Sequence, residues 1–582
     1  MNRVINWLKQ YDTPVSTVGF AVFRITFSMF LLVLISSIYY YRPIIFNTIP
    51  YIALNPFPAK LFLSIWALVV LSLMIGWQTR TVAIINYLFV VIAAFTFSNS
   101  GCGSFNDDLM RIGSFLLIIM PAKQSYSIDH VLHSIKYGQR PSNQTSYWNY
   151  LAALFVSLGL MYWASSLTKI YSPMWNKGLG LWIPSVMPHN KWHGLTFYLN
   201  WKWAHITANY LTMAWEFGLI FALFFKKIRP YAAWIGVIFH MVLASIFPFP
   251  LLCFGPIPFY LLFVNDTFWQ KIKPKHVQIT INPNIQKQRA LARLILGLNS
   301  TTTILNHNQF NININQSEYN SGWLAAKAAF QTSWFGKIIA FFIGFELVRL
   351  FIDFILEDVI TLQTKEQTPQ PIISEKIRYG MLGIFCFGLL SVQTFYSSYH
   401  FYSRIKGGVT VNELKKFYAI RKDISDYSLK PSNLFRTLFG LNARGVFLDH
   451  SLSGSKTVFA VVQKQVNGDT LWLPFFNAKG YCMNMNMNLA WSKYTFNSVC
   501  SGTIPNPQEL EKALWFWANI NNIKTDSLDF AILKRTYYFP STYQKDYHQQ
   551  LINQSWVPEG NVTWRKGKYT YTPLDSIQPT VN

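Results

Sequence analysis

The chain has 582 residues, of which 51% are hydrophobic and only 13% are charged. Soluble domains rarely have this balance, so much of the apolar surface is expected to face lipid. The net charge of +25 does not indicate nucleic acid, because the basic residues are scattered through loops and form no nucleic-acid-binding motif. We attribute that charge to membrane topology and to contact with anionic lipid. Composition therefore predicts an integral membrane protein.

Eight apolar runs approach the roughly 20 residues that a membrane span needs. They lie at about 17–38, 60–77, 79–98, 108–121, 147–167, 207–225, 230–247 and 249–265. No small-residue cleavage site follows the first run, which is therefore expected to remain as a span and not to be removed as a signal peptide. The last two runs are rich in proline and are expected to be bent or partly re-entrant. We predict a polytopic α-helical membrane bundle over residues 1–268.

Lysine and arginine in the short loops favour an N-terminus on the inner side of the membrane. The inner loops would hold Arg3, Lys9, Arg80, Lys123, Lys136, Arg140, Lys226, Lys227 and Arg229. The contrast is weakened by four lysines in the 168–206 loop on the other side. The chain is thus expected in the cell membrane as a multi-pass protein.

Two soluble parts and one further span follow the bundle. Residues 269–360 are predicted to be a soluble insert with a strand at 277–281 and a helix from Gln286 to Leu298. The run 334–356 carries three charges at helical spacing, which favours an amphipathic helix over a span. The run 379–395 has no charge, so residues 376–400 are predicted to be an additional transmembrane helix.

The tail, residues 401–582, has the composition of a soluble α+β domain and would lie outside the cell. Strands are expected at Thr457–Val466 and Thr470–Phe475, and a helix near Pro507–Asn521. In an oxidising compartment Cys482 and Cys500 could form a disulfide, although a pair of buried thiols is an equal alternative. With five cysteines and no Cys-x-x-Cys spacing, no metal site is predicted.

The stretch from Leu160 to Leu179 is the most informative candidate site. Lys169 ends the fifth apolar run, seven residues after Tyr162 and six before Trp175. A lysine in this position can be partly desolvated, which would make the neutral amine available as a base. The alternative is a lysine that snorkels to the membrane surface.

A second candidate site precedes the short fourth run, where Asp107, Asp108 and Arg111 stand close together. Charged groups at the mouth of a membrane helix must be paired or hydrated. Asp108 and Arg111 could line a polar cavity, or they could be a simple ion pair at the start of a helix.

Two further ionisable residues fall inside apolar runs. His240 lies in the seventh run and could relay a proton or bind a polar ligand, or it could be a core histidine with one hydrogen bond. Glu216 lies in the sixth run, where a carboxylate must be protonated or paired with a nearby base.

The ordered set Phe23-Arg24-Ile25, Asp108 to Arg111, Ser127-Ile128-Asp129, Lys169 to Gly178 and Phe239-His240 resembles the HTTM family, the membrane domain shared with vitamin K-dependent gamma-carboxylases. The resemblance covers about residues 10–268, and Lys-x5-Trp-x2-Gly is its most specific part. It implies an outer-side active site that uses reduced vitamin K or another lipid quinol. Lys169 would be the base that deprotonates the quinol, and a protein or peptide would be the substrate.

One position departs from the carboxylases, which carry Asn-Asn-His where this chain has Asn106-Asp107-Asp108. Replacing the imidazole by a carboxylate argues against carboxylation itself. Residues 277–356 also faintly resemble a DCC-type thioredoxin-like domain, but the loop at Asn282 lacks its cysteines. Dithiol chemistry would then be lost.

We therefore predict a membrane enzyme of this class. The candidate catalytic residues are Lys169, His240 and Asp108, and the candidate substrate-binding residues are Trp175, Arg111, Glu216 and Tyr162. The alternative is a non-catalytic membrane scaffold whose outer tail binds a partner.

Overall fold

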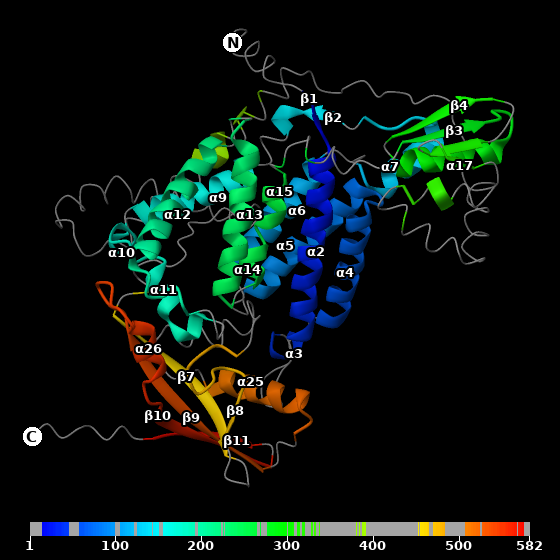
Figure 1. The fold of residues 1–582 in the computed structure, drawn as a ribbon. Helices are drawn as coiled ribbons and strands as arrows, with labels where there is room; N and C mark the ends of the chain where they lie inside the picture. Colours follow the sequence, from blue (N-terminus) through cyan, green and yellow to red (C-terminus); the bar gives the residue numbers. More distant parts are fainter. Residues whose placement is uncertain are drawn as a thin grey trace, which may run out of the picture.

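The computed structural model is mostly helical and ends in a domain that contains a β-sheet (Figure 1). The description is confined to residues 14–45, 58–98, 105–120, 125–142, 144–149, 155–170, 172–191, 196–222, 227–248, 250–262, 276–299, 301–307, 454–464, 470–483, 507–523, 527–566 and 568–574, with shorter pieces between and beside these ranges.

Helices occupy all eight apolar runs of the N-terminal half. They are α2 (Val18–Tyr40), α4 (Ala59–Ile75), α5 (Thr79–Ser98), α6 (Phe105–Ile119), α9 (Leu160–Ile170), α12 (Lys202–Ala222), α13 (Arg229–Ile246), α14 (Pro250–Phe254) and α15 (Ile257–Leu261), and a π-helical turn at Phe155–Gly159 leads into α9. By length and hydropathy, α2 and α13 are the two described helices that could each cross a membrane. The count of eight spans therefore stays a prediction.

Proline interrupts the eighth run as expected. The run forms two short helices, α14 and α15, and the second begins after Pro256. Phe259 of α15 nevertheless packs its ring against Phe23 and Phe27 of α2, with ring centroids 5.1 and 5.8 Å apart. The broken helix thus remains part of the apolar core.

Buried hydrogen bonds connect the helices of the bundle. The indole of Trp66 in α4 donates to Asn86 in α5 over 3.0 Å, and the amide of Asn86 donates to Ser114 in α6 over 2.9 Å. Side-chain bonds of this kind hold membrane helices together where burial of apolar surface gives no preference between a helix and lipid.

Arg24 and Asp129 stabilise the end of the bundle at which α2 begins. Arg24 is fully buried and donates to the carbonyl of Tyr126 over 2.6 Å. The carboxylate of Asp129, in α7 (Ile128–Tyr137), accepts bonds from the backbone N–H groups of Gln78 and Thr79 at the start of α5. These two motif residues fasten α2, α5 and α7, and they have a structural role here.

The insert is a small α/β unit with sheet order β4-β3-β5-β6. Its elements are β3 (Val277–Ile281), α17 (Gln286–Leu298), β4 (Thr302–Asn306), β5 (Asn311–Ile314) and β6 (Ser317–Tyr319). The predicted strand and helix are confirmed. The parallel β3–α17–β4 unit is compatible with a thioredoxin-like domain but is common to many folds, so that resemblance stays a prediction.

The insert is fastened to α7. The guanidinium of Arg140 donates to three carbonyl oxygens of the insert, those of Leu296, Asn299 and Thr302, at 2.7 to 3.1 Å. Arg293 of α17 donates in turn to the carbonyl of Ile135 over 3.1 Å. Most of 334–356 lies outside the described residues, as does most of the expected further span at 376–400, of which 387–391 are helical.

In its described residues, the C-terminal domain is an antiparallel sheet of order β11-β10-β9-β7-β8 with two helices. Its elements are β7 (Ser455–Lys464), β8 (Thr470–Trp472), α25 (Pro507–Ile520), β9 (Ser527–Tyr538), α26 (Tyr547–Ile552), β10 (Val557–Arg565) and β11 (Lys568–Pro573). The predicted strands and helix correspond to β7, β8 and α25. Cys482 is half-buried, and Cys500 lies outside the described residues, so the disulfide stays a prediction.

This domain packs on the end of the bundle opposite to the insert (Figure 1). Rings of Tyr40 and Tyr41, where α2 ends, lie 5.8 and 5.5 Å from the ring of Phe516 in α25. The loop between α9 and α12 shares one apolar core with the sheet, through Trp175, Trp182 and their neighbours. The bundle and the C-terminal domain are therefore joined by a packed interface.

Candidate functional site

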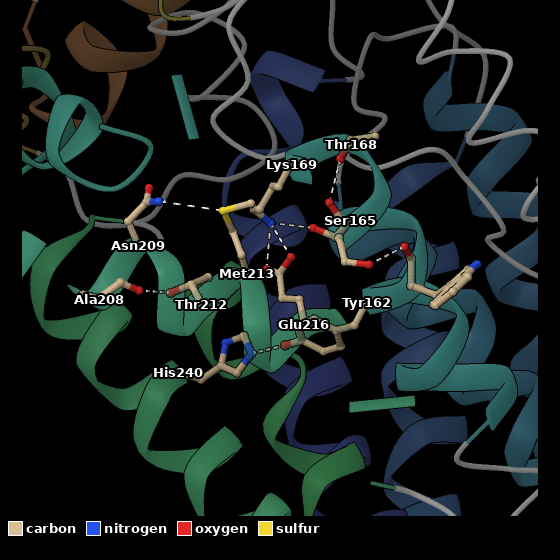
Figure 2. Close-up of polar contacts among 12 residues, drawn as sticks. Tyr162, Ser165, Thr168, Lys169, Ala208, Asn209, Thr212, Met213, Glu216 and His240 are labelled. Atoms are coloured by element: carbon tan, nitrogen blue, oxygen red, sulfur yellow. Dashed lines mark hydrogen bonds and ion pairs between the residues drawn. The ribbon is translucent and has the colours of Figure 1, made fainter. Parts of the chain in front are cut away.

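The centre of the candidate site is a buried ion pair between Lys169 and Glu216 (Figure 2). Lys169 lies in the last turn of α9, and Glu216 lies on α12; their side chains are 4% and 7% exposed. The ammonium donates to both carboxylate oxygens, at 2.7 and 2.5 Å, and to the hydroxyl of Ser165 one turn earlier, at 2.6 Å. All three donors of the ammonium are thus engaged.

Lys169 consequently does not snorkel to a surface. Its side chain turns toward the neighbouring helix, where Glu216 supplies the counter-charge. Of the two states expected for Glu216, the structure has the paired one. Taking two charges out of water costs several kcal/mol per ion unless the geometry compensates, so each partner requires the other.

Trp175 covers the ammonium from the loop that follows. The Lys169 Nζ lies 5.0 Å from the centre of the Trp175 ring, within the range of a cation–π contact. A short helix, α10 (Pro173–Asn176), presents this ring after Ser172 caps its start. The chain then turns at Gly178, which has a left-handed φ of 75°.

Asn209 holds this loop from α12. It lies two turns before Glu216 on α12, and its amide donates to the Trp175 carbonyl over 2.8 Å. Gly180 completes the loop by packing against the Trp175 ring, where a Cβ atom would lie 2.2 Å from a ring atom. The Lys-x5-Trp-x2-Gly spacing is thereby explained, because the lysine, the indole that covers it and the glycine turn are consecutive parts of one loop.

A second polar pair lies beside the first. The hydroxyl of Tyr162 in α9 is 2.5 Å from Nε2 of His240 in α13. Tyr260 of α15 packs near both, with ring centroids 6.2 Å from Tyr162 and 5.7 Å from His240. Both alternatives for His240 remain open, because a core histidine and a proton relay would each make this bond.

The structure brings five of the seven predicted residues into this region: Lys169, Glu216, Trp175, Tyr162 and His240. The other two lie on α6. The side chain of Asp108 lies outside the described residues. The positive charge of Arg111 interacts with the hydroxyl of Tyr87 in α5. The expectation that Asp108 and Arg111 line the same pocket stays a prediction.

Sequence reasoning did not identify Ser165, Asn209 and Tyr260. Ser165 could have been found, since a residue four positions before Lys169 shares its helix face. Asn209 had the same signal from Glu216, seven residues later on the same face of α12. For Tyr260 no local pattern existed, because its neighbours come from three helices. In the described part of the chain, no group of three or more His, Cys, Asp or Glu side chains could hold a metal ion.

The family model of the HTTM domain matches residues 13–268. These residues are an HTTM domain. The match includes every site residue named above, from Arg24 to Tyr260, and ends where the insert begins. No curated protein and no solved structure gives a significant match to the chain. Residues 13–268 thus belong to a domain family of membrane proteins, whereas the reaction has to be argued from the site.

Proposed function

We propose that the HTTM domain is the catalytic part of a membrane enzyme that acts with a reduced lipid quinone, and that Lys169 and Glu216 serve together as its general base. The observation that carries this proposal is the buried ion pair beneath Trp175. When bound, such a quinol would supply a hydroxyl proton to be removed and, on oxygenation, a strong base. Trp175, Tyr162 and Tyr260 are buried beside the pair, and their rings are the aromatic groups against which a quinol ring would pack on entering the site.

The pair explains how a lysine that carries a counter-ion can act as a base. A proton that moves from the ammonium to Glu216 along their short hydrogen bond leaves a neutral amine on Lys169 and a neutral carboxylic acid on Glu216. The amine then accepts the proton of a hydroxyl held beside Trp175 and becomes an ammonium again. Glu216 keeps the first proton until it is released. Charge and protons balance at each step.

The test uses purified full-length protein in lipid nanodiscs with reduced vitamin K as the probe. Wild type should oxidise or epoxidise the quinol, and Lys169→Ala should lower the rate by about 10²–10⁴, the usual contribution of a general base. Lys177→Ala is the matched control, because Lys177 is an exposed lysine on the same loop. A wild-type rate no higher than that of Lys169→Ala would refute the proposal.

The proposal includes an orientation in the cell membrane, as a multi-pass protein with the C-terminal domain outside. Two observations support it: the insert and the C-terminal domain lie at opposite ends of α2, and Arg80, Lys136 and Arg140 lie at the insert end. A protein or peptide substrate would then reach the site from outside. Protease added to intact cells should cleave the C-terminal domain and spare the insert; cleavage of the insert alone would reverse the orientation.

A second candidate is a non-catalytic membrane scaffold whose outer domain binds a partner. It is favoured by the saturated bonding of Lys169, whose three donors are all used inside the protein. The presence of Asp108 where the carboxylases have a histidine also favours this candidate. If Lys169→Ala restores growth of a deletion strain fully and removal of residues 452–582 does not, the scaffold is the better account.

A further inference from the structure

The segment around α26 contacts the loop that follows Lys169, although the two are more than 350 residues apart in the chain. The ring of Trp182, in α11 (Trp182–Val186), is fully buried and lies 4.9 Å from the Tyr543 ring and 6.1 Å from the Tyr547 ring. Nδ1 of His548 donates to the carbonyl of Val186 over 2.6 Å. The C-terminal domain therefore binds both the side chain and the backbone of α11.

A reciprocal pair of hydrogen bonds adds a second attachment at the start of α26. The amide of Asn200 donates to the Asp546 carboxylate over 2.5 Å, and the backbone N–H of Asp546 donates to the Asn200 side-chain oxygen over 2.9 Å. Asp546 has a left-handed φ of 58°, a conformation that Asp adopts more readily than most residues. These bonds place α26 against the segment that leads into α12.

The loop that the α26 segment contacts is the loop that carries Trp175. Only six residues separate Trp175 from Trp182, and Gly180 between them packs directly on the Trp175 ring. Trp175 and Trp182 are both fully buried in one apolar core with β7, β9 and β10. Close-packed side chains transmit a displacement to their neighbours, so a shift of α11 must also displace the ring of Trp175.

We propose that the C-terminal domain is a structural part of the Lys169 site: by clamping α11 through Tyr543, Tyr547 and His548, it holds Trp175 over the Lys169 ammonium. Trp182 is then a positioning residue, since it transmits the clamp and touches neither Lys169 nor Glu216. The catalytic meaning of this clamp rests on the proposed function, whereas the clamp itself is a statement about geometry and can be measured without turnover.

The measurement is chemical labelling of the Lys169 amine in the full-length protein in nanodiscs. A small amine-reactive acetylating reagent is added for a fixed time, and the acetylated fraction is read by mass spectrometry. Tyr543→Ala removes the ring that contacts Trp182 and should raise the labelling rate of Lys169 by at least about tenfold, as the cover opens more often. Tyr543→Phe keeps the ring and should label like wild type.

Two more variants keep the test independent of folding defects in the C-terminal domain. Asn200→Ala lies on the bundle side, leaves the sequence of the C-terminal domain intact, and should raise labelling several-fold by releasing Asp546. Tyr538→Ala is the matched control, because the Tyr538 side chain is exposed and the substitution keeps its backbone carbonyl, which accepts a hydrogen bond from Tyr547.

Trp175→Ala defines the fully uncovered rate. Labelling that rises in Trp175→Ala but stays at the wild-type rate in both Tyr543→Ala and Asn200→Ala would overturn the proposal, as would no rise in Trp175→Ala itself. A protein that protects Lys169 through this clamp yet shows no quinol chemistry would refute the proposed function and leave this inference standing.

Discussion

At the scale of single residues, Lys169 and Glu216 depend on each other more than on the rest of the site. Both are buried, and every donor of the ammonium is bonded. Such pairs add little stability over an apolar replacement, but a single buried charge without its partner is costly. This asymmetry distinguishes an intact buried pair from two independent polar residues.

We expect Lys169→Met and Glu216→Leu each to destabilise the HTTM domain by about 3–5 kcal/mol, because each leaves one buried charge alone. The double variant should be more stable than either single one, since no charge is then left. The measurement is the thermal unfolding midpoint of the four proteins in the same nanodiscs. Destabilisations that simply add in the double variant would show that the two side chains do not form the pair in the membrane.

The sequence predicts which residues belong to this site, but it does not predict which of them form pairs. Lys169, Glu216 and His240 stand out because ionisable residues are rare in apolar runs. Which of them pair is decided by helix packing: Lys169 and Glu216 lie 47 positions apart, and Tyr162 and His240 lie 78 apart. Neither separation leaves a periodic pattern in the chain.

At the scale of elements, the apolar runs were sufficient to predict where the helices lie, and the prolines were sufficient to predict the break in the eighth run. Each of the eight runs contains a helix, and the break between α14 and α15 falls among prolines that cannot donate a helical hydrogen bond. The short helices α7, α10 and α11 were not predicted, since pieces of 4 to 10 residues are too short to show a period. Those short helices nevertheless carry the contacts to the insert and to the C-terminal domain.

The loop from α10 to α11 makes a prediction at this scale through Gly180. Gly180→Ala places a methyl group where the Trp175 ring now lies, so the ring must leave its position over Lys169. We expect a loss of about 1–3 kcal/mol in stability, typical of overpacking, together with faster acetylation of Lys169.

Gly218→Ala is the matched control for this prediction. A Cβ atom at Gly218, on α12, meets no atom within 4 Å. Alanine also favours helix over glycine by about 0.5–1 kcal/mol, so this variant should be as stable as wild type or slightly more stable. Equal effects at Gly180 and Gly218 would mean that the loop tolerates a displaced Trp175.

At the scale of the whole molecule, two units that contain β-sheets contact opposite ends of one helical bundle (Figure 1). The composition of the tail predicted a separate domain, and its strands confirmed an α+β unit. Its docking on α11 could not be predicted from the sequence, because neither Trp182 nor Tyr543 belongs to a sequence pattern that indicates a contact between them. Their contact exists only once the bundle and the sheet are assembled.

Burial in the docked interface lowers the pKa of three basic groups. His548 lies between Val186 and Tyr481, and burial, aided by the charge of Lys191, lowers its pKa to about 4. His189 stacks on Tyr537 with centroids 5.6 Å apart, and burial, aided by Lys456, lowers its pKa well below the usual value. Burial also lowers the pKa of Lys191 to about 7.

These shifts give docking a definite dependence on pH. A histidine whose pKa falls from about 6.5 when exposed to about 4 when docked contributes its full stabilisation above pH 6.5 and loses it as pH falls toward 4. In that window, each such histidine changes the free energy of docking by up to about 1.4 kcal/mol per pH unit. Lys191 acts in the same direction at higher pH, so docking should strengthen further between pH 7 and 10.5.

Hydrogen exchange of the segment 183–191 should therefore accelerate between pH 6.5 and 4, after correction for the intrinsic pH dependence of exchange. His548→Gln keeps an N–H donor for the Val186 carbonyl but cannot take up a proton. The stability of docking in this variant should therefore change less steeply with pH, by the contribution of one titrating histidine. His189 supplies the slope that remains. Tyr538→Ala changes an exposed side chain and removes no titratable group of the interface, so it should keep the wild-type slope. If His548→Gln and wild type show the same slope, His548 is not buried in its neutral form and the C-terminal domain does not dock on α11 in this way.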